Sequence, residues 1–299
     1  GRYIKAGATS YLLLNTSDIR PVSMTTKAVM DIAWKGLPAD SAHPAGDFYR
    51  QWATEEFGAK AAPAIATVYE SYFQAPAHFG TPPLEYGDNL YHTEARRMML
   101  AYMIDFPLYS ISGQAPKWEV PRAVGFGPGG TTASEWLQAA TAREIKQCSD
   151  AQPRWDAVWQ QALAAEPLVE TSRREFYQAA VLTMITINRE SNRMLLEISR
   201  AIEDANKGDM AAAKRDQAAA ESALTAVHAA QTKAEYGKWK NWYRGDGLTG
   251  VYRTQQVADE FGKYLGDPQI HLPPPVLWSE WDAYYHIMHY EGDRSVDVK

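Results

Sequence analysis

Two long helical segments near the centre of the chain, separated by one glycine-containing turn, restrict the fold more than any other part of the sequence. Apolar residues recur at helical spacing from Ser172 to Asn206, and Gly208 ends that pattern. The second segment, from Met210 to about Trp242, is rich in alanine, which permits close approach of helix backbones. Because the connection is short, the two helices are expected to pack antiparallel. This predicts a mainly α fold, a helical bundle with long antiparallel helices.

The rest of the sequence predicts further helices, each bounded by proline, glycine or a capping residue. They span about 24–34, 47–57, 61–73, 88–104, 132–148, 153–166 and 255–265. Asp47 is the expected N-cap of the second helix, and Pro153 the expected start of the sixth. Only Tyr11–Leu14 reads as a strand, and a run without alternation is typical of a parallel strand buried on both faces. Convincing partner strands are lacking elsewhere, so this orphan strand indicates that a sheet has been removed.

Composition excludes several function classes. The net charge of −6 and the lack of a basic stripe argue against nucleic acid as a partner. The longest apolar run, Ala179–Ile187, is about half of what a bilayer crossing needs, so no membrane span is expected. Cys148 is the single cysteine, which rules out an intrachain disulfide and neither requires nor excludes secretion.

A metal site is not expected either. Asp282, His286 and His289 fall at spacings that share one face of a helix, but chains produce that spacing readily by chance. The glycine-rich loop at 125–130 lacks the following lysine and hydroxyl residue of a phosphate-binding loop. We therefore expect no metal and no other cofactor.

Two segments near the first helices carry candidate binding residues. Asn15, Asp18 and Arg20 lie just past the C-terminal end of the predicted strand, which in a (β/α)₈ barrel is the catalytic face. They also suit an ordinary turn closed by an ion pair. Asn89 and Tyr91 lie in a run that mixes hydroxyl, amide, imidazole and carboxylate groups at a helix start. That composition suits a sugar site, or a helix N-cap with a stabilised first turn.

Two later segments also allow either a role in binding or an ordinary structural role. The polar run 188–193 interrupts the apolar face of the longest helix, so it forms an internal hydrogen-bond network or the wall of a cleft. The run 236–246 is the densest in aromatic and cationic residues. It suits a platform for a carboxylated sugar, or a helix terminus packing its aromatic rings on the bundle.

At these residues the chain resembles a known family. The carrying motifs, in chain order, are LNTSDIRP at 14–21, DFYRQWA at 47–53, YHTEARR at 91–97, INRESNRM at 187–194 and AEYGKW at 234–239. Their order and spacing are similar to those of family 115 glycoside hydrolases, the xylan α-1,2-glucuronidases, over roughly residues 10–260. The resemblance implies removal of glucuronic or 4-O-methylglucuronic acid from xylan with inversion of configuration.

The resemblance also implies a domain plan. Residues 1–40 would be the end of the catalytic barrel (its last strand and helix), residues 41–270 a helical domain, and residues 271–299 a linker and the start of a following domain or a C-terminal helix. The catalytic acid and base would lie on earlier barrel strands, outside this chain, which by itself would be inactive. Asn15, Asp18, Asn89 and Tyr91 are the expected sugar contacts.

The expected partners are a glucuronosyl oligosaccharide or polysaccharide derived from xylan and a second copy of the chain, in a secreted or periplasmic setting. The alternative reading is a stand-alone, non-catalytic helical module that binds glycan or another protein. Hydrolysis of glucuronoxylan separates the two hypotheses.

Overall fold

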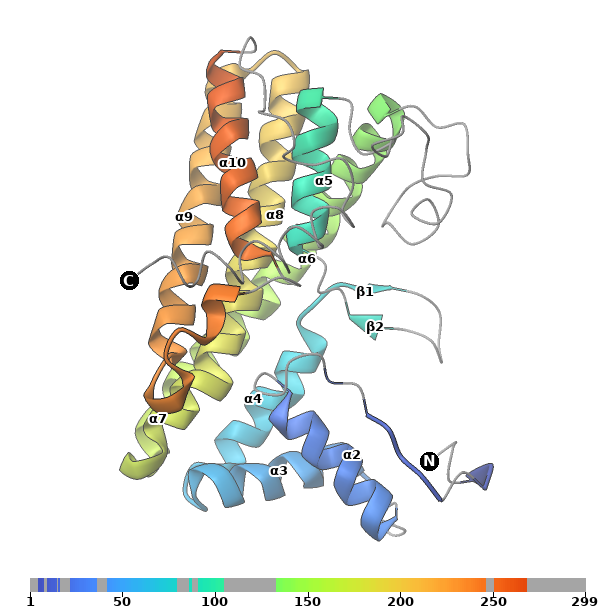
Figure 1. Cartoon of the computed structure of the whole chain (residues 1–299), viewed down its shortest axis with the longest axis vertical. Coiled ribbons are helices and arrows are strands. Elements are labelled where there is room, and N and C mark those ends of the chain that lie inside the picture. The colour runs from blue at the N-terminus through green and yellow to red at the C-terminus, as the bar shows by residue number, and fades with distance from the viewer. Residues whose placement is uncertain are drawn as a thin grey trace. The chain divides into compact units, whose positions relative to one another are not determined.

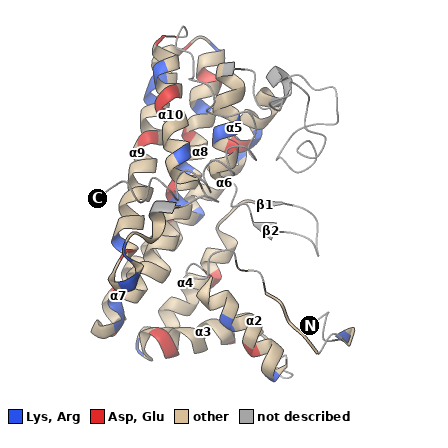
Figure 2. Cartoon of the chain, viewed as in Figure 1, with Lys and Arg blue, Asp and Glu red and all other residues tan. Residues whose placement is uncertain are grey.

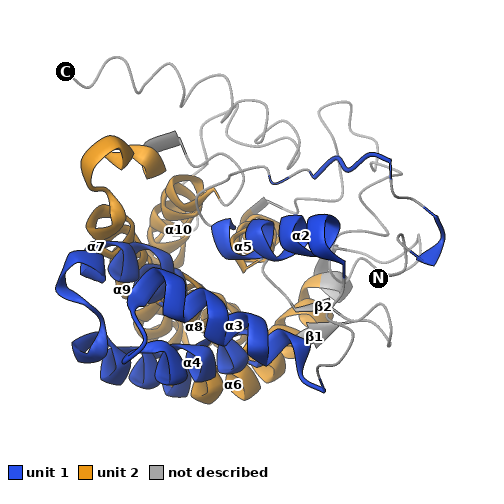
Figure 3. Cartoon of the chain, turned by 90° about the horizontal axis from the view of Figure 1, so that it is seen from below, with its two compact units in different colours: residues 1–74, 157–185 blue, residues 75–156, 186–299 orange. Residues whose placement is uncertain are grey.

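A computed structural model of the chain describes residues 5–7, 10–14, 16, 22–36, 42–79, 86–87, 91–104, 133–245 and 250–267. Helices dominate these residues (Figure 1), which confirms the predicted mainly α fold. The sheet among them is one short antiparallel pair, β1 (His78–Phe79) with β2 (Tyr86–Gly87). The chain divides into two compact units (Figure 3): residues 1–74 with 157–185, and residues 75–156 with 186–299.

The first unit is built from short helices. They are α2 (Ser23–Lys35), α3 (Pro44–Phe57), α4 (Ala62–Gln74), the last turns of α6 (Ala133–Ala165), the 3₁₀ turns η1 (Glu166–Leu168) and η2 (Thr171–Arg173), α7 (Arg174–Tyr177) and the π-helical turn η3 (Gln178–Leu182). Gly58 ends α3 with φ of +96°, a conformation that favours glycine. This stop, predicted from the sequence, lets α3 and α4 pack on each other.

Aromatic rings form the core of this unit. The ring of Phe57 stacks on Phe176 with centroids 5.5 Å apart and meets Tyr177 edge-on at 5.4 Å. The Tyr177 hydroxyl donates to the Ala162 carbonyl oxygen at 2.8 Å, so its buried polar end is paired. Burial raises the pKa of the Tyr177 hydroxyl, which therefore stays protonated.

The second unit contains the long helices. They are α5 (Tyr91–Ile104), most of α6, α8 (Thr183–Asn206), α9 (Met210–Ala234) and α10 (Val251–Gly266), with the 3₁₀ turns η4 (Gly237–Trp239) and η5 (Trp242–Gly245) after α9. Their shared core contains Met98 of α5, Leu195 and Ile198 of α8, Leu224 of α9 and Phe261 of α10. The predicted bundle with long antiparallel helices is confirmed.

The turn between α8 and α9 follows the sequence signal closely. Gly208 adopts φ of +84°, and the backbone N–H of Asp209 donates to the Asp204 carbonyl oxygen at 2.9 Å, which closes α8. The Asp209 side chain then accepts from the backbone N–H of Ala212 at 2.9 Å and caps α9. One aspartate thus ends one helix and starts the next, which turns the chain back on itself.

Three helix boundaries differ most from prediction. The helix expected from Met210 to about Trp242 ends at Ala234, and Gly237 with φ of +52° follows in a separate 3₁₀ turn. Pro153 does not start a new helix, because α6 continues through it as a single helix of 33 residues. A proline removes one helical N–H, yet buried Cys148, Ala151 and Trp155 on either side hold the helix in place. Asp47 is not the N-cap of α3, because Pro44 supplies an earlier first turn and leaves Asp47 within it.

The predicted orphan strand is not tested. Tyr11–Leu14 has no regular secondary structure and all four side chains are exposed, with Tyr11 at 81%. A barrel strand requires neighbouring strands, which the described residues do not supply near this segment. The predicted boundaries after residues 40 and 270 also stay predictions, and residues 271–299 lie outside the described part of the chain.

Candidate functional site

Most of the predicted site residues fall outside the described part of the chain: Asn15, Asp18, Arg20, Asn89, Asp282, His286, His289 and the glycine loop at 125–130. Tyr91 is described, at the first turn of α5, and is 3% exposed. Its hydroxyl accepts from the indole N–H of Trp155 at 3.3 Å. In this structure Tyr91 therefore belongs to the core, and its contact with a sugar stays a prediction.

The next residue, His92, joins two of the predicted polar segments. Its Nε2 lies 2.9 Å from the Ser191 hydroxyl on α8, and its Nδ1 lies 3.1 Å from the Thr254 hydroxyl on α10. All three side chains are buried. The polar run 188–193 thus contributes to an internal network, one of the two alternatives raised by the sequence.

The hydrogen-bond pattern assigns the proton positions of this relay. The Thr254 hydroxyl has one proton, which it donates to the Gly250 carbonyl oxygen at 3.0 Å, so it accepts at its other positions. His92 therefore carries its proton on Nδ1 and donates to Thr254, while Nε2 accepts from Ser191. Burial, with smaller contributions from Arg96 and His228, lowers the pKa of His92 to about 3, so the ring is neutral.

Arg96 fixes the start of α10 within the same network. Its Nη1 donates to the Gly250 carbonyl oxygen at 3.1 Å and to the Thr254 hydroxyl at 2.9 Å. Gly250 has φ of +64°, and a Cβ there would lie 2.8 Å from Arg96 Nη1. The backbone conformation therefore favours glycine at this position, and a Cβ would displace the Arg96 guanidinium from its hydrogen bonds.

A serine and a histidine at hydrogen-bond distance resemble the start of a nucleophilic site. Here, however, Ser191 and His92 are 1% and 3% exposed, so a substrate has no access to the hydroxyl. The partner on the far side of the ring is the neutral hydroxyl of Thr254 rather than a carboxylate. The relay is therefore a structural connection between α5, α8 and α10.

Buried ion pairs connect α5 with α6. Glu94 is fully buried, and its carboxylate oxygens lie 3.9 Å from Arg97 Nη1 and 3.8 Å from Arg143 Nη2. Arg143 Nε also lies 2.8 Å from the buried carboxylate of Glu144. Breaking one partner of such a group leaves an uncompensated buried charge, so these residues depend on one another.

A second polar cluster connects α6 with α8. Arg189 Nε donates to Asp156 Oδ1 at 2.6 Å, and its Nη1 donates to the buried Glu190 at 2.5 Å. Asn192 Nδ2 donates to the Cys148 carbonyl oxygen at 3.0 Å and to Gln152 Oε1 at 2.9 Å. The motif residues Glu94 and Arg189 are therefore each paired within their own helix and with a residue of α6.

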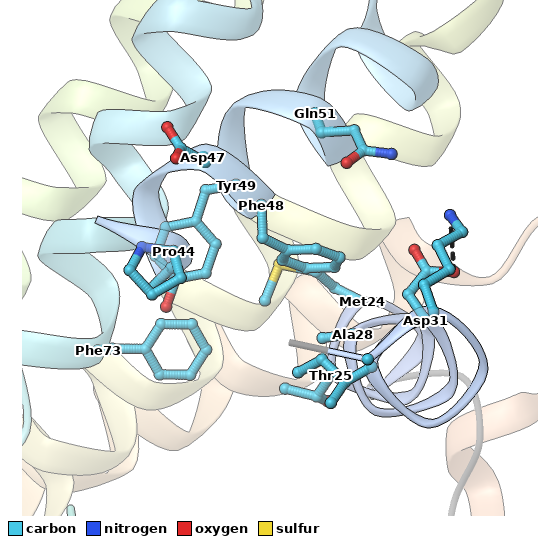
Figure 4. A pocket seen from close by; sticks show the side chains of 14 residues that line it. Met24, Thr25, Ala28, Asp31, Pro44, Asp47, Phe48, Tyr49, Gln51 and Phe73 are labelled. Carbon is cyan, nitrogen blue, oxygen red and sulfur yellow. Dashed lines mark ion pairs between the residues drawn. The ribbon is translucent and has the colours of Figure 1, made fainter. Parts of the chain in front are cut away.

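The first unit contains an apolar cavity of about 520 Å³ between α2 and α3 (Figure 4). Apolar and aromatic side chains provide most of its lining: Met24, Ala28, Ile32, Phe48, Tyr49 and Phe73. Tyr49 and Phe73 stack with their ring centroids 5.8 Å apart.

At the rim of this cavity, Asp31 is paired with Lys27 at 2.7 Å and with Lys35 at 3.7 Å. The hydrogen bond from Lys27 lowers the pKa of Asp31, which stays charged. This chemistry suits an apolar group better than a hydroxyl-rich sugar.

The aromatic and cationic run, for which the sequence left a sugar platform and a packed helix terminus open, lies directly after α9. We call residues 235–243 the α9 connection. The indole rings of Trp239 and Trp242 meet edge-on with centroids 4.8 Å apart, and both are half-buried. The ammonium group of Lys238 lies 5.1 Å from the centroid of the Trp239 ring. Both alternatives raised by the sequence, platform and packed terminus, are compatible with this geometry.

Across the described ranges, no three His, Cys, Asp or Glu side chains gather in a way that could hold a metal ion. Within the same ranges, no helix combines the length and apolar character that crossing a bilayer requires. Cys148 is buried in α6.

Sequence reasoning missed three features of this arrangement. It treated His92 and the run 188–193 separately, because nothing local says that α5 and α8 meet. It gave no role to Thr254, whose neighbours resemble an ordinary exposed helix start. It also missed the cavity, since Met24 and Phe73 come together only through tertiary packing. The one available signal was polarity on otherwise apolar helix faces.

Comparison with known proteins gives one match. The sequence model of Glycosyl hydrolase family 115 matches residues 1–79, about a quarter of the chain. Searches of curated proteins and of solved structures found no match. The match relates the first unit's α2, α3 and α4, together with the apolar cavity, to a glycoside hydrolase family.

Proposed function

We propose that this chain is the helical region of a family 115 glycoside hydrolase that removes glucuronic or 4-O-methylglucuronic acid from xylan with inversion. The observation that carries the proposal is the family match over residues 1–79. The mainly α architecture and the position of the matched residues ahead of the bundle support it. The whole enzyme would act in a secreted or periplasmic setting.

Residues 1–40 would form the end of the catalytic barrel. Exposed apolar side chains in this stretch support the assignment: Tyr11, Leu12, Leu13, Leu14, Met30 and Trp34. Trp34 on α2 is 90% exposed, while Met24 on the same helix is buried and lines the cavity. A helix with apolar residues on two faces is typical of an element packed between two layers. A barrel sheet would supply the second layer.

Residues 41–270 would act mainly as a scaffold and a dimer-forming region. An inverting hydrolase needs a carboxylic acid and a carboxylate roughly 6.5–9.5 Å apart with a water between them. The buried carboxylates of Glu94, Glu144 and Glu190 are instead held against arginines. That arrangement supports a role in stability, with the acid and base elsewhere in the enzyme and Asn15, Asp18, Asn89 and Tyr91 helping to hold the sugar.

Proton NMR of the reaction products tests this proposal. A version of the protein extended N-terminally through the barrel is incubated with glucuronoxylan, and the anomeric signals are followed from the first minutes. The proposal expects free (4-O-methyl)glucuronic acid to appear first as the β-anomer, since inversion of an α-linkage gives β. Release of the α-anomer contradicts inversion, and failure to release any uronic acid contradicts the function itself.

A second candidate is a non-catalytic helical module that binds a protein or a glycan. The exposed apolar residues of the first unit and the adjoining cavity favour it, because such surfaces mark interaction sites. Size-exclusion chromatography with light scattering across a range of concentrations separates the cases. A self-contained module is a defined monomer or dimer, whereas an exposed barrel-facing surface gives concentration-dependent, non-specific association.

A further inference from the structure

We propose that the α9 connection, residues 235–243, is a binding surface for an acidic polysaccharide. In this surface, the indole faces of Trp239 and Trp242 contact pyranose rings, and Lys238 and Lys240 pair with the carboxylates carried by the polymer. The choice of a uronic-acid-bearing polymer rests on the proposed function, but this surface would be separate from the site of hydrolysis.

The first support is the geometry of the tryptophan pair. The two rings lie edge to face at 88°, so they present surfaces in different directions. Both side chains are half-buried, which fixes their positions while part of each indole reaches solvent. Pyranose rings carry axial C–H groups that pack on aromatic faces, and rigid aromatic side chains lose little entropy on binding. Because the edge of one ring rests on the face of the other and the Lys238 ammonium lies 5.1 Å from the Trp239 centroid, the solvent-facing part of each indole is the surface offered to a sugar unit.

The second support is the backbone between the two rings. Asn241 has φ of +60°, and among the described residues it is the one non-glycine residue with positive φ. Asparagine adopts this left-handed conformation more readily than most non-glycine residues, and such positions are found mainly in turns. One hydrogen bond spans it: the Tyr243 N–H donates to Glu235 Oε1 at 2.9 Å, which connects the far side of the turn to the end of α9. This bond restrains the turn within the chain itself, which lowers the ordering cost of binding.

The third support is charge. The α9 connection carries two lysines and one glutamate, and Lys233 precedes it in the last turn of α9, in a protein whose net charge is −6. The glutamate is Glu235, whose carboxylate already accepts from the backbone of Tyr243. Lys238 and Lys240 are exposed, and Figure 2 shows the basic residues at this end of α9. A local cationic surface on an acidic protein favours an anionic ligand at this place over neighbouring surfaces.

Further aromatic surface follows the connection in the sequence. Tyr252 on α10 is 45% exposed, and its ring centroid lies 4.8 Å from that of His228 on α9. Only residues 246–249 separate Gly245 from Gly250, so Tyr252 follows the connection closely in sequence.

The test is binding by the 299-residue chain, measured by isothermal titration calorimetry and affinity gel electrophoresis. The probes are glucuronoxylan, the same polymer with its carboxylates reduced to alcohols, and polyglutamate. The proposal expects binding to glucuronoxylan, with affinity reduced about tenfold for the reduced polymer. Polyglutamate should bind far more weakly, because it offers charge without sugar rings.

Matched variants separate the contributions. Trp239→Ala and Trp242→Ala should each weaken binding to glucuronoxylan about tenfold, while Trp242→Phe retains most of it. Lys238→Gln with Lys240→Gln should weaken binding and flatten its dependence on salt. The controls are Trp34→Ala, which removes a more exposed tryptophan in the other unit, and Lys214→Gln, which removes an exposed lysine elsewhere on α9. Both controls should bind as the parent chain does.

Unchanged binding in both tryptophan variants, verified as folded by circular dichroism, would overturn the proposal. Equal binding to glucuronoxylan and its reduced form would overturn the role of the lysines. Binding to polyglutamate as tight as to glucuronoxylan would identify a general polyanion surface instead. None of these outcomes affects uronic acid release by the N-terminally extended protein. The binding surface and the proposed function are therefore tested by separate measurements.

Discussion

His92 Nδ1 lies 3.1 Å from Thr254 Oγ1, although 162 residues separate the two in sequence. Through Ser191 on one side and Thr254 on the other, a single imidazole ring joins three helices of the second unit. The buried Thr254 hydroxyl accepts hydrogen bonds from His92 and Arg96 and donates one to the Gly250 carbonyl oxygen. A buried polar network of this kind is stabilising only while every member is satisfied.

Thr254→Val keeps the shape of the side chain and removes this shared hydroxyl. We expect it to lower the free energy of unfolding by about 2–4 kcal/mol, because two buried donors lose their acceptor. Urea unfolding followed by circular dichroism measures the change. Thr225→Val is the matched control, since Thr225 makes the same bond to the carbonyl four residues earlier but is exposed. Equal losses in the two variants would contradict the network.

The low pKa of His92 predicts an acid-sensitive stability. Above about pH 6.5 the ring is neutral in both states, and its native contribution is fully present. As the pH falls from 6.5 towards 3, His92 binds a proton in the unfolded chain but stays neutral in the folded chain. Stability attributable to His92 should therefore fall by roughly 1 kcal/mol per pH unit in this window.

His92→Gln tests this dependence, because glutamine does not titrate. The variant should be less stable than the parent at pH 7.5, and the gap should narrow at pH 5.5 and 4.5. Titration of all other groups is common to both proteins and cancels in the difference. A gap that stays constant from pH 7.5 to 4.5 would show that His92 is not held neutral.

Glu94→Gln removes the buried negative charge that faces Arg97 and Arg143. We expect a loss of about 3 kcal/mol, because the buried Arg97 loses this counter-charge, whereas Arg143 is partly exposed and keeps Glu144. Lys146→Gln breaks the exposed pair with Asp150 and should leave the urea midpoint unchanged. If the two variants had the same midpoint, burial of the Glu94 cluster would be wrong.

Leu13→Lys with Trp34→Lys tests the exposed apolar surface of the first unit. Since both side chains are exposed in the chain, the double variant should keep its free energy of unfolding within about 0.5 kcal/mol and aggregate less. In a protein extended through the barrel, the same changes should reduce stability and activity. An extended protein that tolerates both lysines would argue against burial of this surface.

Local signals were enough to predict much of the helical framework. The antiparallel pair α8 and α9 follows from apolar periodicity and Gly208, and α3 stops at Gly58 as expected. Pro153 misled the prediction, because tertiary burial of Cys148 and Trp155 outweighs a local break. The π-helical turn η3 carries no local signal, since its residues are ordinary helix formers.

The site was harder to predict for a physical reason. The local sequence pattern showed that His92 and Ser191 are polar residues in helical segments. It did not show that α5 and α8 would bring His92 Nε2 and Ser191 Oγ to 2.9 Å from each other. The partner Thr254 lies on a third helix, and only the fold selects it. The alternatives for the run 188–193 could therefore be separated only by the structure, which makes it part of an internal network.

The central proposal, that this chain completes a glucuronidase whose catalytic groups lie elsewhere, is tested most directly by release of uronic acid from glucuronoxylan. The 299-residue chain and a version extended N-terminally through the barrel are assayed side by side at equal molar concentration. The account predicts turnover by the extended protein and none by the chain alone. Turnover by the chain alone would contradict it, because its own carboxylates would then suffice.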